Sequence, residues 1–308
     1  MRKRHHHARI PRILLFAAAS LLISGVLAVV PKWSVPVAAF EIAGHKDSLF
    51  ALPPVLEKSA DGAFQIIDYR EMRDINGRDQ IVERRVKRNY VDLSVRRKTR
   101  LRMFSGDGRR LEIGEAGQFE GARFAVIFIH GRNGDRRLGM DDYRFGGNFN
   151  RLKNLAVKNG GVYIAPSVRS FDDNGVADIA ALIAVFKRQS VGAPVILACG
   201  SMGSIICLSL ARDRTAAKMI SGMVLLGGSP DEGLPASALA KARTPITFMH
   251  GSADAVYSHE AQRAVFDALR AKYPGYPTQF LLLNGGSHGS PIRMIDWKSI
   301  LSDMLASH

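Results

Sequence analysis

A continuous apolar run that leads into a serine flanked by small residues constrains the fold of this chain more than any other feature. Residues 195–200 carry no charge and are rich in aliphatic side chains, which is typical of a buried parallel strand. Ser201 follows, and residues 202–212 then place apolar side chains at helical spacing. The pattern predicts a strand, a sharp turn at Ser201 and a helix that begins directly after the turn.

A serine at such a turn is called a nucleophile elbow. It projects above the edge of the sheet at the N-terminus of a helix, where backbone N–H groups and the helix dipole favour developing negative charge. The associated pattern is G-x-S-x-G. Gly203 supplies its second glycine, whereas Cys199, which is also small, replaces the first. The pattern alone also fits an ordinary strand–turn–helix unit in which Ser201 caps the helix.

Three further polar residues each lie just past the end of a predicted strand. They are His130 after residues 127–129, Asp254 after residues 246–250, and His288 after residues 279–283. Because the carboxyl ends of parallel strands meet at one edge of a sheet, where ligands bind in open α/β folds, we expect these side chains to lie near Ser201.

With these motifs, residues from about Phe124 to the C-terminus resemble the α/β-hydrolase superfamily, whose triad has the chain order serine, acid, histidine. The resemblance implies that Ser201, Asp254 and His288 form such a triad. Ser201 would be the nucleophile, His288 the general base and then the general acid, and Asp254 the group that orients the imidazole.

The resemblance also implies an oxyanion hole made of the backbone N–H groups of Met202 and Arg132. We expect His130 to shape the loop that carries Arg132 rather than to act as a second base. His250 is predicted to end a core strand. Asp231, which follows another predicted strand, is an alternative acid in a less typical setting.

Predicted strands and helices alternate regularly from residue 121 onwards. One helix is expected over residues 148–158, and a second begins after a cap at Asp172. A third follows Ser201 and ends at about Arg212, a fourth runs from Ser258 to about Lys272, and the last begins at Ser290, with strands between them. We therefore predict an α/β class, with the α/β-hydrolase fold: a mostly parallel central sheet, helices on both faces and antiparallel leading strands. Residues 228–245 are too few for a large cap domain.

The first 39 residues have the pattern of an export signal. Basic residues within 1–12 precede an uncharged apolar run over 13–30. The run is long for a cleaved signal peptide and short for a membrane span, and residues 37–39 are small enough for cleavage. Residues 1–39 are thus predicted to be a signal peptide or a signal anchor, with the rest exported to the periplasm or held outside the cytoplasm on the inner membrane.

The remaining chain is predicted to contain a linker, residues 40–62, and a hydrolase domain, residues 63–308. Within this domain, residues 63–120 are expected to form the leading strands and residues 121–308 the catalytic core. The leading strands are expected at residues 64–70 and 81–86 around an Asn76-Gly77 turn, at 90–95, and on either side of an Asp107-Gly108 turn.

The formal net charge of +15 is concentrated in the N-terminal segment and in residues 78–110. This basic segment is consistent with contact to an anionic membrane surface, or with solubilised strands that resist edge-to-edge pairing. Nucleic acid is not an expected partner, because the basic residues are not interleaved with aromatic ones. The sequence leaves the oligomeric state open.

The two cysteines, Cys199 and Cys207, are predicted to be small buried core residues rather than a disulfide. No cysteine and histidine spacing suits zinc, and no glycine-rich loop with a lysine is present to hold phosphate. We therefore expect neither a metal nor a cofactor.

Together these features predict a serine hydrolase of the carboxylesterase or lipase type. It would cleave an ester, thioester or amide of a small molecule or envelope component through an acyl-enzyme on Ser201. The alternative is a catalytically silent, hydrolase-like binding protein of the cell envelope. We expect a shallow site walled by residues 132–147, with Leu138, Met140, Tyr143 and Phe145 as apolar members, and by residues 169–173.

Overall fold

The computed structural model describes residue 1 and residues 40–306 of the 308-residue chain. The expected signal peptide or anchor therefore lies outside the described residues. Among the helices of the described part, none combines the length and the apolar character that crossing a bilayer requires.

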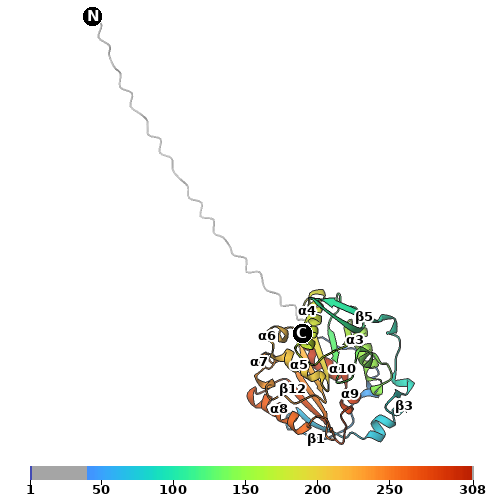
Figure 1. Cartoon of the computed structure of the whole chain (residues 1–308). Helices are drawn as coiled ribbons and strands as arrows, with labels where there is room; N and C mark the ends of the chain where they lie inside the picture. The colour runs from blue at the N-terminus through green and yellow to red at the C-terminus, as the bar shows by residue number, and fades with distance from the viewer. Residues whose placement is uncertain (2–39, 307–308) are drawn as a thin grey trace. The chain divides into compact units, whose positions relative to one another are not determined.

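Ten strands form one central sheet with the order β1-β2-β12-β11-β10-β9-β7-β8-β6-β5 (Figure 1). The strands from β2 to β8 in this order run parallel, whereas β1 at one edge and the β6–β5 hairpin at the other are antiparallel to their neighbours. The sheet strands are β1 (Val55–Lys58), β2 (Phe64–Ile67), β5 (Thr99–Gly106), β6 (Arg109–Ala116), β7 (Ala125–Ile129), β8 (Val162–Pro166), β9 (Val195–Gly200), β10 (Gly222–Leu226), β11 (Ile246–Gly251) and β12 (Thr278–Leu283).

Helices cover both faces of this sheet. The α-helices are α1 (Asp47–Phe50), α2 (Arg136–Met140), α3 (Asn148–Lys158), α4 (Asp173–Gln189), α5 (Gly203–Arg212), α6 (Arg214–Ala217), α7 (Ala238–Lys241), α8 (His259–Lys272), α9 (Ser290–Met294) and α10 (Trp297–Leu305). Side chains of α3 and α10 belong to the core on one face, and those of α4, α5 and α8 to the core on the other. Successive residues of β7 alternate between the two cores, which explains why this strand is apolar throughout.

The predicted fold class is confirmed in the region that follows residue 121. Helix α3 has the predicted bounds, Asp172 caps α4 through its side chain, and Ser258 caps α8. Between β10 and β11 the chain forms only short turns and the four-residue α7, so no cap domain is inserted there. The predicted last helix is instead two helices, α9 and α10, which are separated at Ile295 and Asp296.

Residues 40–62 were predicted to be a linker, but they belong to the folded body. They contain α1 and the edge strand β1, and Ile42 and Phe50 are buried. β1 forms a hairpin with β2, and β2 pairs in parallel with β12 at the edge of the sheet farthest from β5. Residues 64–67, predicted to belong to the antiparallel leading strands, thus lie at the opposite edge of the sheet from β5 and β6 and run parallel to β12.

The segment between β2 and β5 also differs from its prediction. Residues 81–86 split between β3 (Asp79–Ile81) and β4 (Arg85–Val86), which form a separate two-stranded sheet. Asn76 and Gly77 lie at the end of a π-helical turn, η1 (Met72–Asn76), instead of in a hairpin. The Asp107-Gly108 turn is confirmed, since it joins β5 to β6 with both residues at positive φ.

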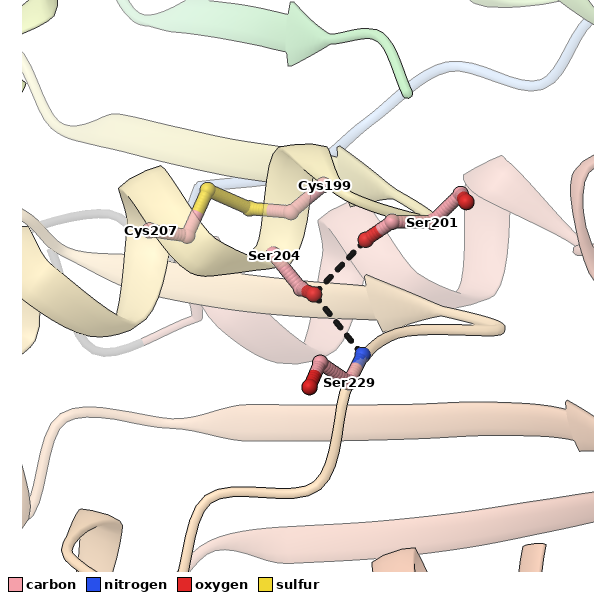
Figure 2. The surroundings of a disulfide bond; sticks show 5 residues. All are labelled: Cys199, Ser201, Ser204, Cys207 and Ser229. Carbon is pink, nitrogen blue, oxygen red and sulfur yellow. Dashed lines mark hydrogen bonds between the residues drawn. A yellow bond between two sulfur atoms is a disulfide. The ribbon is translucent and has the colours of Figure 1, made fainter. Parts of the chain in front are cut away.

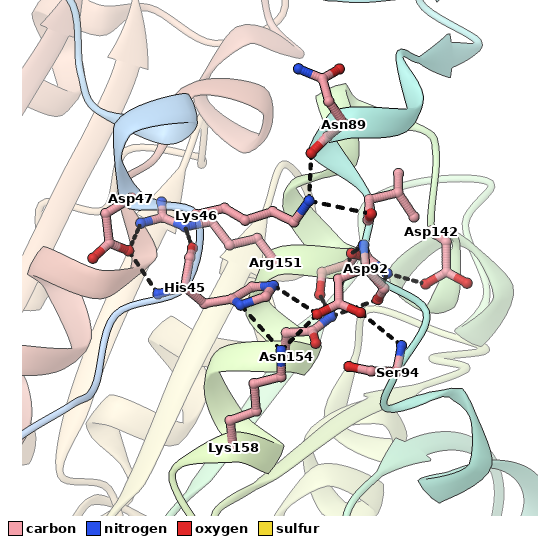
Figure 3. A network of polar contacts seen from close by, with 12 residues as sticks. His45, Lys46, Asp47, Asn89, Asp92, Ser94, Asp142, Arg151, Asn154 and Lys158 are labelled. Carbon is pink, nitrogen blue, oxygen red and sulfur yellow. Dashed lines mark hydrogen bonds and ion pairs between the residues drawn. The ribbon is translucent and has the colours of Figure 1, made fainter.

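Residues 90–95 do not form the predicted strand, because they pair with side chains of α3 rather than with another strand (Figure 3). The backbone N–H of Asp92 donates to Asn150, and its carbonyl accepts from Asn150 and Asn154. The Asp92 carboxylate pairs with Lys158 at 2.6 Å. This segment thus covers part of the polar face of α3.

Candidate active site

The sequence at the end of β9 folds as the predicted elbow. Ser201 has φ of 51°, a left-handed backbone conformation that is uncommon outside glycine. Its N–H donates to the Leu226 carbonyl at 3.0 Å. The Ser204 hydroxyl donates to the Ser201 carbonyl and accepts from the Ser229 N–H, so it ties the elbow to the chain after β10 (Figure 2). These contacts hold the strained turn.

Two glycines allow the backbone to approach the elbow. A Cβ at Gly203 would lie 2.3 Å from the Ile129 carbonyl oxygen, and one at Gly131 would lie 2.7 Å from the Ser201 Cβ. Because real side chains do not approach so closely, both positions need glycine. This is the physical reason for the glycine after the serine and for the His-Gly pair at the end of β7.

The structure brings Ser201, His288 and Asp254 together at the carboxyl edge of the sheet. His288 Nε2 lies 2.8 Å from Ser201 Oγ, and His288 Nδ1 lies 2.7 Å from Asp254 Oδ2. The Asp254 side chain is fully buried, whereas that of His288 is 28% exposed. The three residues follow β9, β11 and β12, so the parallel order of these strands sets the distances.

Asp254 is fixed by its own loop as well as by His288. Its Oδ1 accepts the backbone N–H groups of Val256 at 2.8 Å and Tyr257 at 3.1 Å. Burial acts to raise the pKa of Asp254, but the hydrogen bonds from His288 and from these two N–H groups outweigh it and lower the pKa. The carboxylate is therefore ionised at neutral pH and its orientation is fixed.

His250, which sequence reasoning treated only as the end of a core strand, also contacts the carboxylate. Its Nε2 lies 3.1 Å from Asp254 Oδ2, and its ring is completely buried. Burial lowers the pKa of His250, so the ring is neutral at pH 7. The one sequence signal was the spacing of four residues from Asp254 across a strand end, which does not by itself indicate contact.

The other candidate residues lie apart from this group. His130 is buried, accepts the Val168 N–H at Nε2 and faces the Gly131 carbonyl with Nδ1, so both ring nitrogens are used in holding the loop after β7. Asp231 forms an ion pair with Arg212 and is not in contact with His288.

Ser201 and His288 open onto a cleft of about 430 Å³. Leu138, Phe145, Val256 and Ile292 supply its apolar lining, and the chain from Gly131 to Gly134 forms the rim beside Ser201. A larger cleft of about 710 Å³ lies beside α6 and α7, but its lining includes no histidine or cysteine.

The predicted walls of the site are correct on one side only. Residues 132–147 contribute Leu138 and Phe145, but Tyr143 instead lies under the guanidinium of Arg85, at 4.1 Å from Arg85 Cζ to the ring centroid. Residues 169–173 do not line the cleft. Its opposite side is made by Val256, after β11, and by Ile292 of α9.

Cys199 and Cys207 form a disulfide, contrary to the prediction (Figure 2). Both residues are fully buried, as predicted, but the bond joins the end of β9 to α5, the two elements that flank Ser201. The eight-residue separation spans the elbow turn, which brings the end of the strand back against the helix. Reasoning from element directions alone missed this proximity.

Among residues 40–306, no cluster of three or more histidine, cysteine, aspartate or glutamate side chains is arranged to hold a metal ion.

Comparison with solved structures identifies the class of fold. The chain is similar to a protein from Agrobacterium tumefaciens described as an α/β hydrolase of unknown function (TM-score 0.52, 17% identity, covering 67% of this chain and 94% of that one). It is also similar to an α/β serine hydrolase homologue from Coxiella burnetii (TM-score 0.50, 18% identity, covering 67% of this chain and 97% of that one). A third similar structure is an esterase from Pyrococcus furiosus (TM-score 0.50, 14% identity, covering 67% of this chain and 91% of that one). The chain has the α/β-hydrolase fold. Neither a protein-family model nor a curated protein matches the sequence.

Proposed function

We propose that this protein is a serine hydrolase that cleaves an acyl substrate through an acyl-enzyme on Ser201. One observation carries the proposal: the unbroken chain from Ser201 Oγ to His288 to Asp254, at 2.8 Å and 2.7 Å, with the hydroxyl facing a cleft. A serine hydroxyl is a weak nucleophile, and this arrangement supplies the base that activates it and the acid that orients the base.

The reaction follows from these contacts. His288 Nε2 accepts the proton of Ser201 Oγ as the oxygen attacks the substrate carbonyl carbon, and a tetrahedral intermediate forms. His288 then donates this proton to the leaving alkoxide, thiolate or amine as the bond to the carbonyl carbon breaks. Water enters, loses a proton to His288 and attacks the carbonyl carbon of the acyl-enzyme. The bond from this carbon to Ser201 Oγ then breaks, His288 returns the proton to Oγ, and the acid is released.

The negative oxygen of the intermediate would be bound by the backbone N–H groups of Met202 and Arg132. Met202 lies directly before α5, and Arg132 follows Gly131, whose Cα packs against Ser201. Within residues 40–306, neither N–H group donates to another protein atom, so both are available to a ligand. Losing one such donor typically costs about 3 kcal/mol of transition-state stabilisation.

The cleft favours a short or medium acyl group. Its volume of about 430 Å³ and its apolar lining fit a compact hydrocarbon chain, and the chain between β10 and β11 inserts no cap domain that could enclose a longer one. We therefore place carboxylic esters first, with thioesters and amides as related substrates. The alternative remains a silent envelope binding protein with the same fold.

A fluorophosphonate probe separates these two functions. The enzyme should be labelled at Ser201, with labelling lost in Ser201→Ala, and it should hydrolyse p-nitrophenyl esters with a maximum at short or medium chain length. Absence of both labelling and turnover in folded protein would favour the silent binding protein. Parallel assays with thioesters and amides would define the leaving group.

We also propose that residues 40–308 act outside the cytoplasm, as the basic and apolar N-terminal pattern predicts. The Cys199–Cys207 disulfide supports this location, because such bonds persist mainly in oxidising compartments. An alkaline phosphatase reporter fused after residue 60 should be active. Activity only of a cytoplasmic reporter at the same position would contradict export, and mass spectrometry of the N-terminus would distinguish a cleaved signal from an anchor.

Contact with an anionic envelope surface is a further part of this proposal. Arg97, Lys98 and Arg100 line one groove, and within residues 40–306 none of them has an ion-pair partner. If they bind lipid headgroups, their joint replacement by glutamine should weaken sedimentation of the envelope-purified protein with phosphatidylglycerol vesicles more than replacement of Arg137 and Arg169 does. Equal effects would indicate a non-specific charge effect.

A further inference from the structure

His250 makes more polar contacts than packing in the core requires. Its Nε2 faces two oxygens, the Tyr257 carbonyl and Asp254 Oδ2, each at 3.1 Å. Its Nδ1 lies 2.6 Å from the side-chain oxygen, Oε1, of Gln262 on α8. Both ring nitrogens of a fully buried imidazole are thus directed at polar groups, and one of these groups is the acid beside His288.

The surroundings determine which nitrogen carries the proton. A carbonyl and a carboxylate only accept hydrogen bonds, so Nε2 must bear the hydrogen that it shares between them. A neutral ring then presents Nδ1 as an acceptor, and the Gln262 amide must turn its NH₂ group towards it; the two ends of an amide are interchangeable in shape. The two oxygens at Nε2 therefore fix the tautomer of His250, and Gln262 adapts to it at Nδ1.

This N–H group contacts Asp254 directly and influences His288 through Tyr257. It places a positive dipole beside the same oxygen, Oδ2, that accepts from His288. It also holds the carbonyl of Tyr257, whose N–H donates to Asp254 Oδ1 and whose ring lies 5.9 Å from the His288 ring. Rotation of the carboxylate, or displacement of the loop that supports His288, would break the contact with His250.

We propose that His250 is a positioning residue for the catalytic acid: it holds Asp254 and Tyr257 in place and moderates the pull of the carboxylate on the His288 proton. The inference rests on the proposed hydrolase function. It goes beyond that function because His250 touches neither Ser201 nor the cleft, and it acts only through Asp254 and Tyr257.

Two substitutions separate this role from that of a simple core residue. Glutamine places its side-chain nitrogen about as far along the side chain as Nε2, whereas asparagine reaches only as far as Nδ1. His250→Gln should retain most activity. His250→Asn should lower kcat by about tenfold with little change in KM, since a hydrogen bond to a charged group is lost. With the carboxylate less compensated, protonated His288 is favoured, and the acid limb of the kcat/KM profile should move to higher pH.

Controls keep the outcomes distinct. His45→Asn, which removes a partly buried histidine outside the lining of the cleft, should lower the Tm without moving the acid limb. Wild-type kcat and an unchanged pH profile in His250→Asn, with Ser201→Ala inactive, would overturn the role of His250 alone. Turnover by Ser201→Ala would overturn the proposed function itself. Equal losses in His250→Gln and His250→Asn that follow the Tm would show a merely structural residue.

A second variant decides the matter if His250→Asn does not fold. Gln262→Leu leaves His250 in place but removes the partner of Nδ1, so the imidazole is held by hydrogen bonds at Nε2 alone and its orientation is less well fixed. We expect a several-fold lower kcat, an unchanged KM and a shift of the acid limb in the same direction. A wild-type pH profile and kcat in folded Gln262→Leu would contradict the proposal.

Discussion

Two polar networks in this protein are built from similar residues, and only one of them borders a cleft. Around Asp254 lie His288, His250 and two backbone N–H groups. Around Asp92 lie Lys158 and His45, with Ser94 and Asn150 bound to its backbone or carboxylate (Figure 3). Each network contains a carboxylate beside a histidine, so residue type alone does not distinguish them.

The difference lies in the partner that neutralises the carboxylate. The ammonium group of Lys158 lies 2.6 Å from the Asp92 carboxylate and neutralises it. This ion pair helps to hold the segment around Asp92 against α3. Within residues 40–306 no lysine or arginine pairs with Asp254, whose side-chain neighbours are histidines. In the proposed mechanism, its negative charge stabilises the proton that His288 would take from Ser201. The two networks therefore differ in charge: the Asp92 carboxylate is paired with a lysine, whereas the Asp254 carboxylate, in the network proposed to be catalytic, contacts only histidine side chains and backbone N–H groups.

The largest expected effect is on the reactive side. Ser201→Ala should reduce kcat by about 10⁴-fold or more, since the nucleophile is removed, and should leave the Tm close to that of the wild type. Steady-state kinetics and thermal unfolding of the same preparation measure both quantities. Activity near that of the wild type would remove Ser201 from the mechanism.

Asp254→Asn should come next, with a kcat lower by about 10⁴-fold at most, because the amide favours the wrong tautomer of His288. Asp231 is engaged with Arg212 and is not placed to substitute for it. A loss of less than about tenfold would mean that another acid orients His288. The double variant with Asp231→Asn would then identify Asp231 as that acid or exclude it.

The structural network should respond in the opposite way. Asn150→Ala removes the acceptor of the partly buried Asp92 N–H, which should cost about 1–3 kcal/mol of the free energy of unfolding, with kcat and KM unchanged. Urea unfolding with activity measured in parallel tests this prediction. A large loss of kcat with an unchanged midpoint would show that this network reaches the active site.

Acid should weaken the same network through His45. Burial, aided by nearby Lys158, lowers the pKa of His45 to about 4 from 6.5. Between these values the unfolded chain binds a proton that the folded chain excludes, so stability falls as the pH drops from about 6.5 towards about 4. His45→Gln should show a smaller loss over this range, whereas Asn150→Ala should be less stable at every pH with the wild-type slope. An unchanged slope in His45→Gln would contradict the assignment.

The two networks also show where sequence reasoning succeeds. The elbow and α3 were predicted because their signals are local: an apolar strand, small residues around Ser201, and helical spacing over residues 148–158. The position of β2 beside β12 and the pairing of residues 89–94 with α3 depend on contacts between distant parts of the chain. An alternating pattern reports a half-buried segment without identifying its partner, so the Asp92 network was not foreseen.

Within the candidate site, the same limit applies. The order and strand-end positions of Ser201, Asp254 and His288 were available in the sequence, because parallel strands align their carboxyl ends. The contact of His250 with Asp254 and the Cys199–Cys207 bond depend on how far a turn brings the chain back. Such distances are set by the angle of the turn, which residue spacing does not encode.

The smallest effect is predicted for two aromatic residues of one loop, of which one lines the cleft and the other packs outside it. Phe145 lines the cleft, whereas the Tyr143 ring stacks on Arg85. Phe145→Ala opens the apolar wall, so the preference in kcat/KM should move towards longer acyl chains by about three- to tenfold. Tyr143→Ala should lower the Tm and leave the preference unchanged. A p-nitrophenyl ester series measures both variants. Equal shifts in chain-length preference for the two variants would show that the loop moves as a unit. Tyr143 would then influence the cleft as much as Phe145 does.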